Sequence, residues 1–115
     1  MTARMMPPLD AIGPRVERAL ELTLPERALF RGFLRETTRC APSLVTQRAS
    51  RLAAELQALL EQLDTTFPTA EAGRIWLRQS RPVALGERQP LRMALTGHAW
   101  HVTRELLALQ RRRGP

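Results

Sequence analysis

The sequence of 115 residues lacks several features that define common classes of protein. It has a single cysteine, Cys40, so an intrachain disulfide and a cysteine-rich zinc site are both excluded. No apolar run approaches the roughly 20 residues of a membrane span, and residues 1–9 lack the apolar core and cleavage site of a secretion signal. The length also excludes a large catalytic fold. We therefore expect a small soluble protein of the reducing cytoplasm that has no membrane contact.

Lysine and tyrosine are absent as well, and the charge balance is strongly basic. All 18 basic side chains are arginines, against 11 acidic ones, which gives a formal net charge of +7. Both halves of the chain carry an excess of arginine, so the charge is not confined to one tail. A surface of this kind favours polyanions or acidic protein faces as partners.

Aromatic residues make up only 4% of the chain although 43% of it is hydrophobic, so leucine and alanine must build the core. These residues favour helices. Apolar residues recur at spacings of three and four along most of the chain, and no segment shows a strand pattern or an internal repeat. The pattern predicts an all-α protein with helices over 14–22, 26–36, 44–65, 70–79, 90–96 and 98–111.

Prolines, glycines and hydroxyl residues mark the expected helix boundaries. Pro14 should open the first helix, after an extended segment over 1–13. Ser43 and Thr69 are suited to cap the helices that follow them. Gly97 would end a short helix in a left-handed conformation that lets the last helix fold back.

Catalysis has little support in the sequence. His98 and His101 could place two imidazoles on adjacent faces of one helix, but no third metal ligand and no HExxH pattern accompany them. Cys40 has no histidine nearby in the sequence, and the glycines are isolated rather than gathered in a phosphate-binding loop. We therefore predict no catalytic residue, no metal and no cofactor.

The two helices over 14–36 form a short unit that resembles a helix-turn-helix. Its second helix carries three arginines at a spacing of four, which suits contacts with phosphates or base edges in a DNA groove. These candidate DNA-binding residues are Arg27, Arg31 and Arg35. The alternative is an ordinary solvated face, because nearby glutamates could neutralise it. Those glutamates are Glu17, Glu21, Glu26 and Glu36.

A family resemblance appears within residues 70–110. Its elements, in order, are Ala72, Trp76-Leu77, Pro82, Leu85-Gly86, Arg88, Pro90-Leu91, Leu95, Gly97, Val102 and Leu106. This order and spacing look like the toxin-binding domain shared by antitoxins of the Xre, MbcA and ParS group. The chain departs from the family pattern at Ser80-Arg81, where Pro-Asn is frequent, and at Glu87, where glycine is frequent. Residues 24–34 and the segment from Arg51-Leu52 onward resemble the family's helix-turn-helix and connecting helix.

The resemblance implies the antitoxin of a type II toxin–antitoxin pair whose partner is a RES-type toxin that consumes NAD. It also implies inhibition by obstruction of the toxin's active site, a homodimer, operator DNA as a second partner and autorepression. The expected regions are a helix-turn-helix-like part over 1–43, a connecting helix over 44–67 and a toxin-binding domain over 68–115.

The residues assigned to these roles fall into two sets. The expected toxin-binding residues are Leu85, Gly86, Arg88, Arg92, His98, His101, Arg111, Arg112 and Arg113, of which the last three would form a mobile arm. The expected structural residues are Trp76, Pro90, Gly97 and Val102. Trp76 is expected to be a core anchor whose truncation to alanine would cost about 3 to 5 kcal/mol.

Two other functions remain open at this point. One is a small DNA-binding transcriptional regulator without a toxin partner, in which the second half only dimerises. Salt-dependent operator binding by the isolated protein would favour it. The other is an adaptor that docks a different acidic protein.

Overall fold

The computed structural model describes residues 8–39 and 42–113, with side chains of the second range described from residue 47 onward. The α-helices are α1 (Leu9–Ala19), α2 (Leu24–Thr37), α3 (Pro42–Thr66), α4 (Ala70–Gln79), α5 (Pro90–Leu95) and α6 (Ala99–Arg113). A 3-10 turn, η1 (Val83–Leu85), lies between α4 and α5. The described part of the chain contains no strand, so the prediction of an all-α protein is confirmed.

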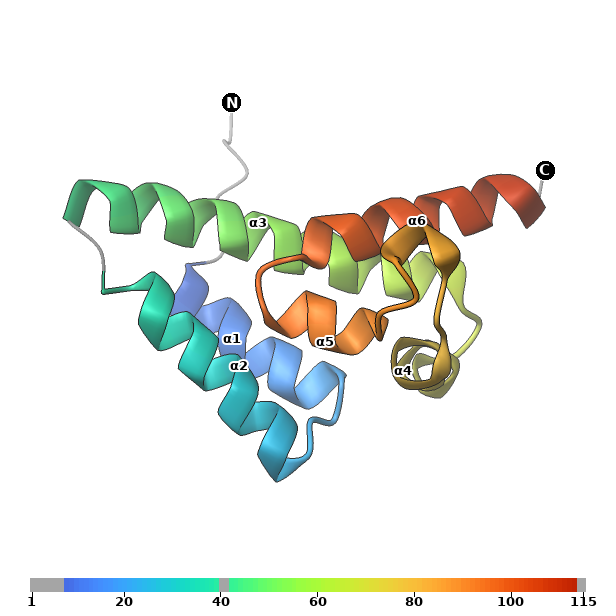
Figure 1. The fold of residues 1–115 in the computed structure, drawn as a ribbon, viewed down its shortest axis with the longest axis horizontal. Coiled ribbons are helices and arrows are strands. Elements are labelled where there is room, and N and C mark those ends of the chain that lie inside the picture. Colours follow the sequence, from blue (N-terminus) through green and yellow to red (C-terminus); the bar gives the residue numbers. More distant parts are fainter. Residues whose placement is uncertain (1–7, 40–41, 114–115) are drawn as a thin grey trace.

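Helix α3 is the element on which the others are assembled. It packs most extensively against α6 and α1, and also contacts α4 and α2. Figure 1 shows α3 and α6 running along one edge of the molecule, with α1, α2, α4 and α5 on the same side of that pair. No described helix is both long enough and apolar enough to pass through a membrane.

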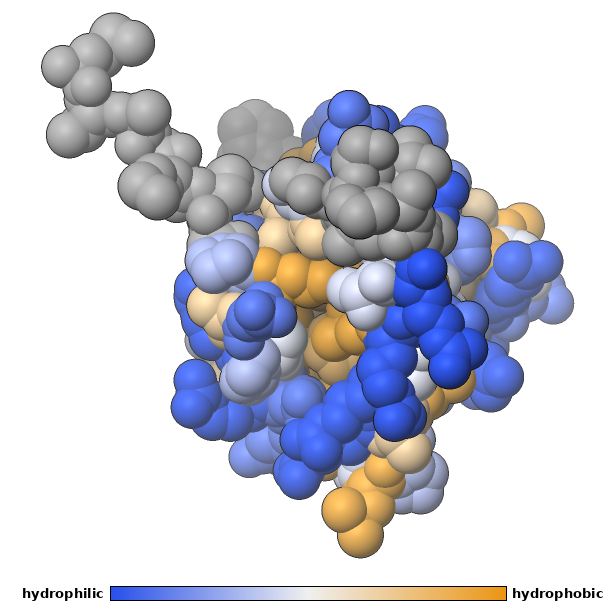
Figure 2. All heavy atoms as spheres, turned by 90° about the vertical axis from the view of Figure 1, so that its left-hand side faces the viewer, coloured by the Kyte–Doolittle hydropathy of each residue, from blue (hydrophilic) through white to orange (hydrophobic). Residues whose placement is uncertain are grey.

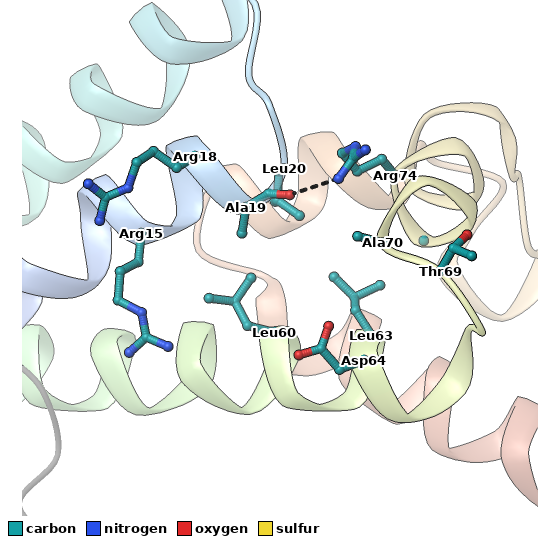
Figure 3. Close-up of a pocket in the computed structure, with 11 residues that line it drawn as sticks. Arg15, Arg18, Ala19, Leu20, Leu60, Leu63, Asp64, Thr69, Ala70 and Arg74 are labelled. Carbon is teal, nitrogen blue, oxygen red and sulfur yellow. Dashed lines mark hydrogen bonds between the residues drawn. The ribbon is translucent and has the colours of Figure 1, made fainter.

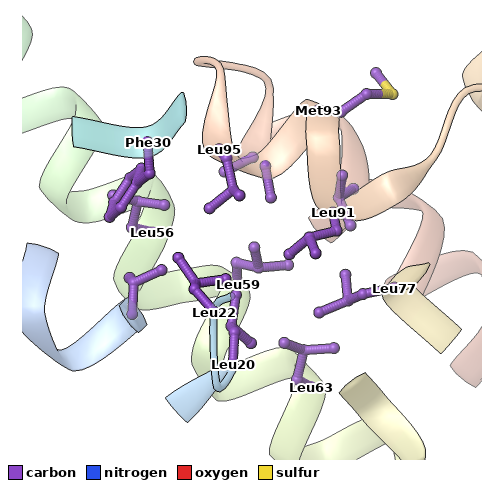
Figure 4. Packing of buried hydrophobic residues seen from close by; sticks show 14 of the residues in the cluster. Leu20, Leu22, Phe30, Leu56, Leu59, Leu63, Leu77, Leu91, Met93 and Leu95 are labelled. Atoms are coloured by element: carbon purple, nitrogen blue, oxygen red, sulfur yellow. The ribbon is translucent and has the colours of Figure 1, made fainter. Parts of the chain in front are cut away.

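One apolar core connects all of these elements. Leu56 and Leu59 of α3 are at most 1% exposed and lie at its centre (Figure 4). Phe30 of α2, Leu77 of α4 and Leu91 of α5 pack into the same cluster. Because aromatic side chains are scarce, leucine methyl groups provide most of the buried area that stabilises the fold.

The start of α1 corrects a sequence-based prediction. The helix begins at Leu9, not at Pro14, which lies inside it. Ile12 and Val16 are at most 1% exposed and lie on the helix that packs against α3. Burial of this face stabilises a helix that begins upstream of Pro14. This gain in free energy outweighs the cost of the one backbone hydrogen bond that a proline removes.

Helix α2 begins at a capping box that also precedes its predicted start. The Thr23 hydroxyl accepts a hydrogen bond from the Glu26 amide at 3.3 Å, and the Glu26 carboxylate accepts one from the Thr23 amide at 2.9 Å. The reciprocal pair satisfies two amides that would otherwise be unbonded. Glu21, in the turn before it, has a positive φ of 49°.

The boundaries of α3 and α4 were predicted closely. Helix α3 begins at Pro42, one residue before the expected cap Ser43, because proline is well suited to the first position of a helix. Cys40 lies outside the described residues. Helix α4 follows Thr69, whose hydroxyl accepts a hydrogen bond from the Ala72 amide at 3.1 Å, as predicted.

The end of α6 overturns a second prediction. Arg111, Arg112 and Arg113 are the last turn of the helix and not a mobile arm. The Arg113 guanidinium donates a hydrogen bond to the Thr66 carbonyl and lies 5.8 Å from the centre of the Phe67 ring. Contacts with the end of α3, far away in the sequence, therefore hold the final turn in place.

Candidate functional site: a cationic groove between η1 and α6

A groove of about 500 Å3 lies between η1 and the outer face of α6. We call it the η1–α6 groove. It is lined by Ala84, Leu85, His101, Arg104, Glu105, Leu107, Ala108 and Arg111. Three residues of the expected toxin-binding set, Leu85, His101 and Arg111, therefore come together at one place.

The periodicity of α6 explains why these side chains share a face. His101, Arg104, Ala108 and Arg111 follow one another at intervals of three and four residues, which places them on one side of a helix. Val102 and Leu106 of the same helix are fully buried on the opposite side. Helix α6 is thus fixed to the core by one stripe and presents the other to the groove.

The loop over 80–89 forms the second wall. Leu85 is only 8% exposed, so it fixes the loop to the core rather than presenting a side chain to a partner. Gly86 has a φ of 68° and closes the turn with a hydrogen bond from its amide to the Val83 carbonyl at 2.9 Å. Arg88 is exposed, and its Nε atom lies 4.0 Å from where a Cβ on Gly86 would stand.

The accessible charge of the groove is positive. Glu105 is the only carboxylate among its lining residues, and Arg112 neutralises it through an ion pair of 2.9 Å. No carboxylate of the described chain forms an ion pair with Arg104 or Arg111. The centre of the His98 ring lies 5.8 Å from that of His101, which lines the groove, but His98 itself does not line it. The site can therefore attract an acidic group without first breaking an internal ion pair.

Other residues of the expected toxin-binding set lie elsewhere. Arg92 borders a separate groove of about 320 Å3 between α2 and α5, beside Leu29 and Leu95. Arg112 is held by Glu105 and Arg113 by the Thr66 carbonyl. Sequence reasoning missed Arg104, Leu107 and Ala108, although their spacing from His101 along the last helix was a usable signal.

The candidate DNA-binding residues lie on α2, where α1 partly neutralises them. The Glu17 carboxylate pairs with Arg27 at 3.4 Å and with Arg31 at 2.8 Å, and Arg35 is exposed. Figure 2 faces the end of the molecule where α2 and the beginning of α3 lie, and shows hydrophilic side chains over most of it. A narrower strip of hydrophobic side chains runs between them.

A second hollow, of about 460 Å3, lies between α1, α3 and α4 (Figure 3). Arg15 and Arg18 stand on one side of it and Arg74 on the other. Arg15 donates a hydrogen bond to Gln57 at 3.2 Å, and Arg74 donates one to the Ala19 carbonyl at 3.5 Å. Arg15 and Arg74 therefore bond to the protein itself, and the three arginines do not converge on a common point.

The expected structural residues occupy interior positions to different degrees. Pro90 and Val102 are buried, and Gly97 has a φ of 91°. Trp76 is only partly buried and packs against Phe67 with ring centres 5.9 Å apart, whereas its neighbour Leu77 is completely buried. Leu77 is therefore the deeper anchor of α4.

No family model, curated protein or solved structure gave a significant match to the chain. Among the described residues, no group of three histidine, cysteine or acidic side chains is placed to hold a metal ion.

Proposed function

We propose that this protein is the antitoxin of a type II toxin–antitoxin pair and that it inhibits a RES-type, NAD-consuming toxin by covering its active site. The η1–α6 groove and the loop beside it would form the toxin contact. Inhibition in this scheme is stoichiometric and requires no chemistry from the antitoxin.

One observation carries the proposal: the residues of the resemblance are the ones that shape this part of the fold. Its leucine and valine members are buried, namely Leu77, Leu85, Leu91, Leu95, Val102 and Leu106, and Trp76 is partly buried. Its two internal glycines, Gly86 and Gly97, have the positive φ values that turn the chain. Together they leave a firm loop and a helix face with unpaired arginines, which suits attachment to an acidic protein surface.

Co-expression with the toxin encoded beside the gene tests this directly. We expect the chain to restore colony growth and cellular NAD, and to copurify with the toxin. The triple variant Arg88→Ala, Arg104→Ala, Arg111→Ala should lose protection, whereas Arg18→Ala, Arg51→Ala on exposed sites of α1 and α3 should keep it. Full protection by a folded triple variant would show that the toxin contact is elsewhere. The absence of a toxin-like reading frame next to the gene would argue against the whole proposal.

The proposal includes a homodimer that binds operator DNA and represses its own operon. The structure supports this part less strongly, because Glu17 already pairs with two of the three candidate arginines of α2. A DNA-binding regulator without a toxin is the alternative. Operator binding that weakens steeply with salt, in a protein that protects against no toxin, would favour that alternative.

A further inference from the structure

We propose that the part of the partner that fills the η1–α6 groove is an acidic amphipathic α-helix. This inference rests on the proposed function, since the toxin would supply that helix. It goes beyond the proposed function by naming the secondary structure and the charge pattern that the antitoxin recognises.

The outer face of α6 carries a second stripe that could pack against another helix. Trp100, Arg104, Leu107 and Arg111 follow one another at intervals of four, three and four residues, the spacing of a seam between two packed helices. Trp100 is 46% exposed, so this stripe begins with a large apolar ring that is accessible to a partner. This stripe is distinct from the buried one, which includes Val102, Thr103 and Leu106.

The turn η1 makes this face concave. Ala84 lies across the groove from Leu107 and Ala108, and Val83, next to Ala84, is 81% exposed. The stripe from Trp100 to Arg111 is about 16 Å long at 1.5 Å per residue, which corresponds to about three helical turns. A partner helix of this length would cover apolar side chains on both walls.

The charge of the stripe determines what kind of helix can pack against it. Arg104 and Arg111 alternate with the apolar residues of the stripe, so the partner needs carboxylates at the positions opposite them. A second copy of this chain would bring a second arginine-bearing stripe against the first, without a carboxylate to pair with either, in a protein that already carries a net charge of +7. Duplex DNA would use the two arginines but would leave the Trp100 and Leu107 side chains without a partner.

Binding of a synthetic helix to the full chain tests the inference. The probe is a fluorescein-labelled peptide of about three heptads, with leucine and glutamate alternating along its seam; it is longer than the stripe because a shorter isolated helix is only marginally stable in water. We expect it to bind, as measured by fluorescence anisotropy, and a scrambled peptide of the same composition to bind at least about tenfold more weakly. The variants Trp100→Ala and Arg104→Glu, Arg111→Glu should each weaken binding of the ordered peptide about tenfold or more. The matched double variant Arg18→Glu, Arg51→Glu should bind it nearly as well as the wild type.

Each alternative result overturns the inference in a recognisable way. Equal binding of the ordered and scrambled peptides would mean that charge alone is recognised. Competition by a short DNA duplex, with the same sensitivity to Arg104→Glu and Arg111→Glu but none to Trp100→Ala, would identify a nucleic-acid surface. No binding of the peptide to a chain that protects cells from the toxin would reject the helix and leave the proposed function intact. Circular dichroism of every variant excludes loss of the fold as the cause.

Discussion

Arg78 of α4 forms a two-pronged ion pair with Glu26 in the first turn of α2, with Nη2–Oε1 and Nε–Oε2 distances of 3.0 and 3.3 Å. The same guanidinium donates a hydrogen bond to the Leu20 carbonyl at 2.8 Å. The Arg78 carbonyl accepts a hydrogen bond from Gln89, at the end of the loop that borders the η1–α6 groove. One residue therefore connects the amino-terminal helices to the loop beside the candidate site.

The Glu26→Gln variant should lose stability in a pH-dependent way. Burial raises the pKa of Glu26, but hydrogen bonds from Arg78 and from the Thr23 amide, with the charge of Arg78, outweigh it and leave the pKa below its ordinary value of 4.5. A lowered pKa means that the ionised carboxylate stabilises the fold above its unfolded-state pKa. That contribution disappears as the pH falls through the folded-state pKa.

Urea unfolding of the wild type and Glu26→Gln across this pH range measures the effect. The difference in unfolding free energy should be greatest near neutral pH and should shrink below about pH 4.5. Glu36→Gln is the control, because Glu36 is 71% exposed and its pair with Arg39 is solvated. A difference for Glu26→Gln that stays constant with pH would contradict this assignment.

Replacement of Gly97 by alanine should destabilise the protein by about 1 to 3 kcal/mol. Gly97 has a φ of 91°, and a Cβ placed there would stand 2.7 Å from Cζ of Phe33. Gly32→Ala is the matched control: its Cβ would meet nothing within 4 Å and it lies inside α2, so alanine should stabilise by about 0.5 to 1 kcal/mol. Thermal unfolding compares the two. A neutral Gly97→Ala would show that the turn does not need a left-handed residue.

Some elements of the fold could be predicted because their signals are local. Thr69 at the start of α4 and Gly97 before α6 act through neighbours a few residues away, and both have the expected conformation. The start of α1 carries a local signal as well, since Leu9, Ile12 and Val16 follow one another at intervals of three and four. Pro14 points to a later start, because proline is more common at the first position of a helix than inside one, and in this chain it lies inside the helix.

The candidate site was only partly predictable. The sequence marks His101 and Arg111, and Arg104 follows His101 at the spacing of one helix face, but the spacing alone does not show that this face borders a groove. The sequence also grouped Arg92 with them, whereas α5 turns Arg92 toward α2. Which surfaces meet across a groove depends on the packing of distant segments, and no periodicity within one helix reports that.

The Glu17→Gln variant should strengthen binding to duplex DNA if α2 contacts DNA at all. Glu17 is only 11% exposed and holds both Arg27 and Arg31, so its charge offsets theirs. Removal of that charge should raise affinity at low salt and steepen the salt dependence by about one to two charge equivalents. Glu71→Gln on α4 changes the net charge equally at an exposed site and should have a smaller effect. Electrophoretic mobility shifts over a salt series measure the DNA affinity of both variants. Equal effects of the two substitutions would show that α2 does not contact the DNA.

Substitutions of two arginines in the last turn of α6 should separate effects on stability from effects on partner binding. Arg113 bonds to the Thr66 carbonyl and lies over the Phe67 ring, so Arg113→Ala should lower the unfolding free energy by about 0.5 to 2 kcal/mol. Arg111 faces the η1–α6 groove, so Arg111→Ala should leave stability within about 0.5 kcal/mol of the wild type and weaken the acidic peptide's binding.

The Phe67→Leu variant separates the two interactions of Arg113, because it removes the aromatic ring but leaves the Thr66 carbonyl in place. If the ring interaction matters, Arg113→Ala should cost less in the Phe67→Leu background than in the wild type, and the coupling energy from the four unfolding curves measures it. Arg111→Ala and Arg113→Ala could instead change stability and peptide affinity in the same proportion. That result would show that the last turn of α6 has no separate anchoring and binding faces, and that Arg111 is not part of the site.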